Sequence, residues 1–238
     1  MNEARLRQDA RVVADNPVEE AILSRRSVRG FLRDPVPMDI VRHLLEIAAR
    51  APSGSNIQPW RTYVLTGNAL ARLKADLLNA FMAGEPEQPP YFYYPRKWRS
   101  PYLERRREIG WGLYALTGVA RGDLEAGQRQ RARNYRFFDA PVGLVFAIDR
   151  DLELGSWLDY GMFLQNFMLA ARARGLDTCP QQSIANYPSI VARHVPVPPE
   201  QMIVCGMALG RVDPAEPANA LVTRREPVEI FATFHEDS

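Results

Sequence analysis

The sequence predicts an α+β or three-layer fold, because helix-forming and strand-forming segments intermix along the whole chain. Residues 38–50 carry apolar side chains at the i, i+4, i+7 spacing of a half-buried helix. Residues 142–148 form an unbroken apolar run, which is typical of a strand covered on both faces. At 238 residues and 46% hydrophobic content, the chain can bury a sizeable core as one large domain or two small ones.

The first third of the chain is expected to alternate helix and strand around one polar loop. Residues 1–16 are polar and charged and are interpreted as an arm that can lie on a partner subunit. Pro17 suits the first turn of a helix, and Asp34-Pro-Val-Pro37 interrupts regular structure. The elements expected here are helices over 17–23, 38–50 and 69–82, and a strand over 61–65.

Residues 84–101 are rich in proline and aromatic residues. This composition predicts an ordered lid or insert, because exposing so many aromatic side chains to water would be costly. A helix is expected over 102–120. Its expected buried face consists of Leu103, Trp111, Tyr114, Ala115 and Val119.

The second half of the chain contains a helix that is apolar on all sides. Ser156 is expected to cap it, with Asp159 in the capping-box position, and Gly175 is expected to end it. A helix of this kind is buried in a core or between subunits. The other elements expected here are strands over 142–148, 176–179, 202–210 and 228–234, and a helix over 189–194.

Positive charge is concentrated in one block. Residues 91–138 contain 11 Lys and Arg but four Asp and Glu, although the whole chain carries a formal net charge of only +2. Such a block is typical of a surface that meets anions, or of a solvated helix face. A nucleic-acid-binding protein that uses residues 91–138 is therefore one alternative, although no known binding motif accompanies the charge.

Cysteine, histidine and hydropathy patterns exclude several other classes. Cys179 and Cys205 lie far apart and the three histidines are scattered, so no metal site and no disulfide framework are expected. No run approaches 18 apolar residues, and no apolar segment follows Met1. We therefore expect a cytoplasmic protein without membrane partners. GxGxxG, P-loop and GxSxG motifs are also absent.

Two polar stretches are candidates for a binding site. Residues 51–60, Ala-Pro-Ser-Gly-Ser-Asn-Ile-Gln-Pro-Trp, present uncharged donors and acceptors between two prolines, although an ordinary polar connection has the same composition. Arg25, Arg26 and Arg29 surround Ser27 at the end of the first helix. Guanidinium groups beside a hydroxyl suit a phosphate, although three arginines also occur on solvated faces.

Together, Arg25-Arg-Ser-x-Arg29 and Pro52-Ser-x-Ser-Asn-x-Gln-Pro-Trp60 resemble the nitroreductase-type FMN oxidoreductases. The resemblance covers residues 17–238 as one FMN-binding domain and is weakest across an insert at about 83–134. It implies a three-layer α/β/α sandwich with a mixed, mainly antiparallel sheet, in a domain-swapped homodimer. The insert resembles a subgroup that acts on nitroaromatic compounds, including nitrobenzoates.

The resemblance also implies roles for individual residues. Arg25, Arg26 and Ser27, with Arg225, bracket the FMN phosphate, and Arg29 lies near the flavin N1 and C2 carbonyl. A second set, contributed by the loop from the partner subunit and by the segment whose backbone approaches flavin N5, consists of Pro52, Ser53, Ser55, Asn56, Gln182 and Ser183. Family members often have Glu-Gly at 182–183 and a basic residue at 223, where this chain has Thr223.

The resulting hypothesis is an FMN-dependent oxidoreductase that uses NADPH or NADH and reduces nitroaromatic compounds by ping-pong hydride transfer. Flavin N5 carries the chemistry, so no catalytic side chain is expected. Tyr91, Tyr94 and Trp98 of the insert are the expected contacts to the small aromatic acceptor. A related flavoprotein that reduces quinones, enones or halophenols is the alternative among enzymes.

Overall fold

The computed structural model describes residues 12–235, and its centre is one four-stranded sheet. The strands are β1 (Arg61–Thr66), β2 (Val142–Asp149), β3 (Asp177–Gln181) and β4 (Gln201–Gly210). Their order is β1-β2-β4-β3, and every neighbouring pair is antiparallel. An isolated parallel bridge joins Ser27 to Thr178 at the β3 edge. The expectation of a mainly antiparallel sheet is therefore confirmed.

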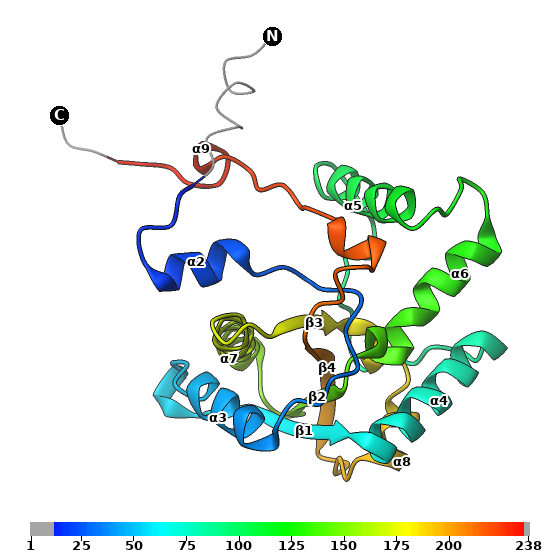
Figure 1. Ribbon diagram of the computed structural model, residues 1–238. Coiled ribbons are helices and arrows are strands. Elements are labelled where there is room, and N and C mark those ends of the chain that lie inside the picture. The colour runs from blue at the N-terminus through cyan, green and yellow to red at the C-terminus, as the bar shows by residue number, and fades with distance from the viewer. Residues whose placement is uncertain (1–11, 236–238) are drawn as a thin grey trace.

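Helices cover both faces of the sheet, which gives the three layers that were expected (Figure 1). On one face, α3 (Met38–Ala48) and α7 (Leu154–Arg172) pack against alternate residues of β2, such as Leu144 and Phe146. On the other face, α4 (Gly67–Ala83) and α8 (Pro188–His194) pack over Val145 and its neighbours. Because β2 is covered on both sides, all of its residues except Asp149 are buried.

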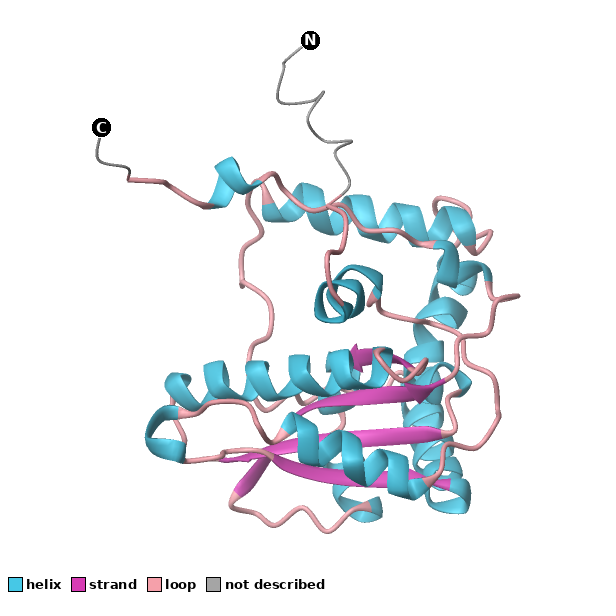
Figure 2. Ribbon diagram, turned by 60° about the vertical axis from the view of Figure 1, so that its left-hand side comes forward, coloured by secondary structure: helices cyan, strands magenta, loops and turns pink. Residues whose placement is uncertain are grey.

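The remaining α-helices lie outside these layers, and Figure 2 shows helical segments well apart from the magenta strands. The α-helices are α2 (Pro17–Ser24), α5 (Tyr102–Leu116), α6 (Leu124–Ala132) and α9 (Val228–Phe231). The 3₁₀ segments are η2 (Gly54–Asn56), η3 (Arg133–Asp139), η4 (Gln182–Asn186) and η5 (Pro217–Ala220). Residues 84–101 contain no regular element, as expected for the insert. No helix in the described part of the chain is long and apolar enough to span a membrane. Residues 1–11 of the expected arm lie outside the described residues.

The expected strand over 228–234 is wrong, because residues 228–231 form helix α9 and coil follows. Apolar residues at 228, 230, 231 and 234 fit one helical turn as well as they fit an alternating strand. The described tail pairs with no strand of this chain.

The expected start of α7 is also wrong. The helix begins at Leu154 after Glu153, so Ser156 lies inside its first turn and does not cap it. The Asp159 carboxylate accepts a hydrogen bond from the Gly54 N–H at 3.0 Å. Asp159 therefore anchors a distant loop and takes no part in a capping box.

The expected buried face of α5 is wrong as well, since none of the residues of α5 is buried in this chain. The helix ends at Leu116 and packs beside η5, outside the three layers, so Trp111 is left half exposed. Helix α6 was not expected, because its charged composition has no apolar stripe.

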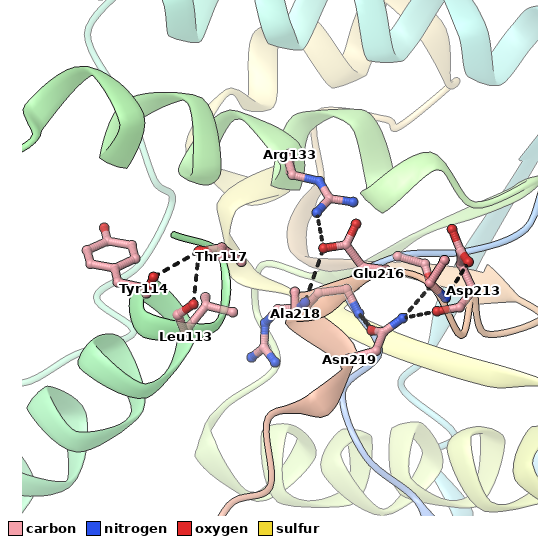
Figure 3. A network of polar contacts seen from close by, with 11 residues as sticks. Leu113, Tyr114, Thr117, Arg133, Asp213, Glu216, Ala218 and Asn219 are labelled. Atoms are coloured by element: carbon pink, nitrogen blue, oxygen red, sulfur yellow. Dashed lines mark hydrogen bonds and ion pairs between the residues drawn. The ribbon is translucent and has the colours of Figure 1, made fainter. Parts of the chain in front are cut away.

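A buried amide joins the arginine-rich N-terminal segment to the segment after β4. The Asn219 side chain accepts from the Arg29 N–H at 2.7 Å and donates to the carbonyls of Gly30 and Asp213 at 2.9 Å each. Figure 3 shows this network beside Glu216, which pairs with Arg133 at 2.7 Å. A Cβ atom at Gly30 would lie 2.2 Å from Glu216, so only glycine fits there. These contacts position Arg29 beside β3.

Replacing Asn219 by alanine should destabilise the fold by about 2–4 kcal/mol, because three backbone groups lose their partner in a buried site. The free energy of unfolding is measured by chemical denaturation at fixed protein and cofactor concentrations. The matched control is Asn68→Ala on the exposed first turn of α4, which should change stability by less than about 0.5 kcal/mol. Equal stability of the two variants would contradict the role assigned to Asn219.

Candidate functional site

Arginine side chains from three parts of the fold line one cavity of about 630 Å³, called here the arginine cavity. They are Arg25 and Arg26 after α2, Arg172 at the end of α7, and Arg225 in the C-terminal segment. Arg172 pairs with Asp177 at 3.1 Å and donates to the Ser24 hydroxyl at 2.9 Å. The other three form no ion pair with residues 12–235. The cavity therefore has an excess of positive charge that suits an anion.

The electrostatic environment of Arg25 also favours a bound anion. Burial lowers the pKa of its guanidinium, and the nearby positive charge of Arg225 lowers it further. Arg225 is exposed and donates to the Thr223 hydroxyl at 2.7 Å. Two cations drawn together in a partly buried place repel each other, so a bound phosphate would stabilise the arrangement.

Ser27 and Arg29 continue from this cavity along the edge of the sheet. Ser27 bridges to Thr178, and the Arg29 guanidinium donates to the Ser27 carbonyl at 3.2 Å. The structure therefore brings Arg25, Arg26, Ser27, Arg29 and Arg225 together beside β3.

Unpaired polar atoms mark the path from β3 into η4. The buried atoms without a hydrogen-bond partner are Thr178 Oγ1, Gln181 Oε1, Gln182 Nε2 and Ser183 Oγ. An unmet buried donor or acceptor costs about 1–3 kcal/mol, so a group of them along one segment indicates a ligand with matching groups. Asp177 at the start of β3 lines the arginine cavity, so this path begins there.

The path ends in a second cavity of about 870 Å³, called here the insert cavity. Gln181, Gln182 and Ser183 form one part of its wall. Aromatic residues of the insert form another part, namely Tyr91, Phe92, Tyr93 and Tyr94. Trp98 lies just behind them, with its ring centroid 5.3 Å from that of Tyr94. Tyr91 and Tyr94 thus line the same cavity as Gln182, with Trp98 beside Tyr94.

Tyr91 connects the insert to the body of the protein. Its ring packs edge-on against Trp157 of α7 at 4.6 Å, and its hydroxyl lies 2.6 Å from Gln182 Oε1 and also contacts the Val204 carbonyl. One hydroxyl proton cannot serve both oxygens. Rotating the Gln182 amide would let Nε2 donate to Tyr91 while Tyr91 donates to Val204. In either orientation the Gln182 amide keeps one unpaired atom.

The loop at 51–60 lies elsewhere in this chain. Its side chains at Pro52, Ser55 and Asn56 are exposed, and Ser53 accepts from the Gln58 N–H at 3.0 Å. Ser55 and Asn56 adopt left-handed φ values of 49° and 58°, which side chains other than glycine adopt at some cost. Asp159, which holds this loop, precedes Arg172 by thirteen residues on α7, a separation of about 20 Å. One chain therefore does not bring this loop to the arginine cavity.

Sequence reasoning missed several residues of the site. Arg172 and Asp177 line the arginine cavity, Thr178 offers a buried hydroxyl, and Asp159 holds the loop. The available signal was the presence of charged residues, Asp159 and Arg172, in an otherwise apolar helix. Among the described residues no group of three or more His, Cys, Asp or Glu side chains could hold a metal ion.

The residues present fit FMN. The arginine cavity has unpaired cations for a phosphate, and the unpaired atoms of β3 and η4 offer donors and acceptors for a polar heterocyclic ring. The insert cavity adds aromatic walls that suit flat rings.

Comparison with known proteins agrees with this chemistry. Residues 22–211 match the model of the Nitroreductase family. A chloronitrobenzene nitroreductase of Comamonas testosteroni is 43% identical over 91% of this chain and 96% of its own length. A 4-nitrobenzoate reductase of Pseudomonas putida is 40% identical over 91% of this chain and 94% of its own.

Solved structures give the same result. The FMN- and NADPH-dependent nitroreductase NfnB from sphigopyxis sp. strain HMH has a TM-score of 0.88 and 35% identity over 92% of this chain and 99% of that one. The FMN-dependent NfnB of Mycobacterium smegmatis, solved with NADPH, has a TM-score of 0.88 and 30% identity over 92% and 98% of the two chains. The resemblance found in the sequence is confirmed: this chain belongs to the nitroreductase family.

Proposed function

We propose that this protein is an FMN-dependent nitroreductase that takes hydride from NADPH or NADH and passes it to nitroaromatic compounds by a ping-pong mechanism. The observation that carries the proposal is the continuous path from the unpaired arginines, along the unpaired polar atoms of β3 and η4, into the aromatic insert cavity. Relatives named for the reduction of chloronitrobenzene, nitrobenzene and 4-nitrobenzoate support the acceptor class.

The overall chemistry balances without a catalytic side chain. One hydride from the nucleotide and one proton from solvent convert a nitro group into a nitroso group and one water molecule, because the oxygen lost as hydroxide takes up that proton. Bound FMN supplies the hydride relay between donor and acceptor. The protein must bind and orient the nucleotide and the acceptor and exclude water.

Individual residues would divide this work. Arg25, Arg26 and Arg225, with the Ser27 hydroxyl, would hold the phosphate through charge-assisted hydrogen bonds. Arg29 would place a fixed positive charge near the ring where electron density increases on reduction. Gln182 and Ser183 would contact the reactive edge of the ring with their unpaired polar atoms.

The insert would cover the acceptor side of the same site. Tyr94 and Trp98 would flank a flat acceptor, and Tyr91 would hold the insert in place through Gln182 and Val204. Burial raises the pKa of Tyr91 well above its ordinary value, so its hydroxyl keeps its proton at neutral pH.

We also propose that the working form is a homodimer whose sites are shared between subunits. The loop with Pro52, Ser53, Ser55 and Asn56 sits near one end of α7 and the arginine cavity at the other end, about 20 Å apart. Packing two copies of α7 antiparallel about a two-fold axis would bring the loop of one subunit to the arginine cavity of the other.

The surface of α7 supports such a dimer. Leu154 and Leu158 are 83% and 71% exposed, and they lie one turn apart on the face that continues through Gly161 and Gln165. Two exposed leucines one turn apart on a long helix are costly in water. The exposed apolar residues of α9, Ile230 and Phe231, offer further surface to a partner.

The structure gives the nucleic-acid alternative little support. Among the basic residues of the block 91–138, Arg105, Arg129, Arg133 and Arg136 pair with carboxylates of this chain. Arg96, Arg99, Arg106 and Arg121 lie over aromatic rings. Part of the positive charge of this block is therefore balanced by carboxylates within the protein, and we keep the enzyme as the proposal.

The purified protein should contain about one non-covalent FMN per chain, and Arg25→Ala or Arg225→Ala should weaken FMN binding by roughly 10- to 150-fold. This corresponds to the loss of one charge-assisted hydrogen bond, about 1.5–3 kcal/mol. Titration of the apoprotein with FMN measures the effect. The matched control is Arg224→Ala, because Arg224 is exposed and points toward Glu108. Wild-type affinity in both test variants would place the phosphate elsewhere, and failure of the wild type to bind FMN would refute the proposed function.

Leu158→Arg should convert the dimer to monomer and lower FMN affinity with it, because a cation would be buried on the α7 face. Sedimentation velocity, combined with flavin absorbance, measures both. The control is Leu124→Arg, since Leu124 is 83% exposed on α6, away from α7. A wild-type monomer that carries tightly bound FMN would contradict the shared site.

A further inference from the structure

Three arginines line the insert cavity, and their charge is not used by the proposed flavin site. They are Arg96 of the insert, Arg106 of α5 and Arg131 of α6. Glu87 is the only carboxylate among the described residues that line this cavity, and it accepts a hydrogen bond from the Tyr135 hydroxyl at 3.3 Å. None of the three arginines forms an ion pair within residues 12–235. The cavity that would receive the acceptor thus has an excess of positive charge.

Arg106 lies against two aromatic rings of the insert, whereas Arg96 lies over one, that of Phe92, at 4.3 Å. The central carbon of its guanidinium lies 4.6 Å from the Trp98 ring centroid and 6.0 Å from that of Tyr94. Stacking on the rings occupies the flat face of the guanidinium and leaves the N–H groups on its edge free. Arg131 is partly engaged, because it donates to the Tyr114 hydroxyl at 3.4 Å.

The surroundings of Arg106 narrow the class of anion. Arg106 lies over the rings of Trp98 and Tyr94, Phe92 and Tyr93 line the same cavity, and the Gln182–Ser183 segment forms another part of the wall. A flat ring with an anionic group at one end matches this lining, because the aromatic walls contact the ring and the guanidinium edge donates two hydrogen bonds to a carboxylate.

We propose that Arg106, assisted by Arg131, selects nitroaromatic acceptors that carry a carboxylate on the ring. This rests on the proposed function and adds the substrate class to it. The phosphate of the nucleotide donor is the other anion that could use the same charge. The carboxylate is favoured because the guanidinium lies among aromatic side chains.

The test compares 4-nitrobenzoate with 4-nitrobenzamide, its neutral counterpart of nearly the same shape, on the FMN-loaded protein. The wild type should show a higher kcat/KM for the benzoate. Arg106→Gln should lower kcat/KM for 4-nitrobenzoate by about 10- to 100-fold and for 4-nitrobenzamide by less than about threefold. Arg106→Lys should recover part of the loss, because it keeps the charge without the planar fork. The matched control is Arg107→Gln, the next residue on α5, which does not line the cavity.

A binding measurement gives a second readout that does not depend on turnover. Benzoate and benzamide are titrated into the oxidised protein and followed by the change in flavin absorbance. The wild type should bind benzoate at least about tenfold more tightly than benzamide, and Arg106→Gln should remove most of that difference. The comparison of benzoate with benzamide needs only the wild type.

Four results overturn the proposal. If the wild type reduces and binds the charged and the neutral compounds equally well, carboxylate selection is excluded. An equal loss for both acceptors in Arg106→Gln would show a general effect of Arg106 on the cavity. A loss confined to flavin reduction by NADPH, with NADH unaffected, would assign Arg106 to the donor phosphate. An unchanged preference in Arg106→Gln would place selection on other residues.

In each case reduction of the neutral nitroaromatic leaves the proposed function standing, whereas a protein without flavin or nitroreductase activity would refute that function itself.

Discussion

The length of α7 is the constraint on which the arrangement of this site depends. The helix is held to the sheet by Phe163 and Phe167, which pack with Phe146 of β2. Near its N-terminal end, Asp159 binds the backbone of the loop at 51–60, and at its C-terminal end Arg172 joins α2 to β3. The helix therefore fixes two polar motifs at a separation of about 20 Å that a single chain does not close. This geometry is the main support for the proposed site shared between two subunits.

Much of the layered fold could be predicted from the sequence, because its signals are local and strong. The unbroken apolar run of β2 predicts a strand with both faces covered, and the spacing of Val41, Leu44 and Ala48 predicts the inward face of α3. The failures occur where a short pattern fits two structures or where packing decides the outcome. The apolar pattern of the tail at 228–234 fits both a strand and a helical turn. The sequence pattern predicts that Trp111 on α5 is a core residue, yet no layer of the described chain covers that helix.

The candidate site could be predicted only through motifs. Arg25, Ser27 and Gln182 were identified because their sequence context resembles a family, and the structure brings them to one strand edge. Thr178 and Asp177 gave no signal, because their importance comes from their position on β3 beside Ser27. The link between Tyr91 and Gln182 joins residues 91 positions apart and depends on how the insert folds back over η4. Such contacts follow from tertiary structure and not from composition.

The central claim is that each site takes its loop from one subunit and its arginines from the other. It can be tested with a heterodimer in which each chain carries one of the two defects. Two tagged chains are co-expressed, one with Arg25→Ala and the other with Ser55→Gly and Asn56→Gly, and the heterodimer is purified through both tags. A shared site predicts that each parent homodimer binds FMN weakly, whereas the heterodimer has one site of wild-type affinity per two chains, because one of its sites combines an intact loop with intact arginines. FMN titration counts that site. A heterodimer with no tight site would contradict the account, since it would mean that both motifs serve the same site from a single chain.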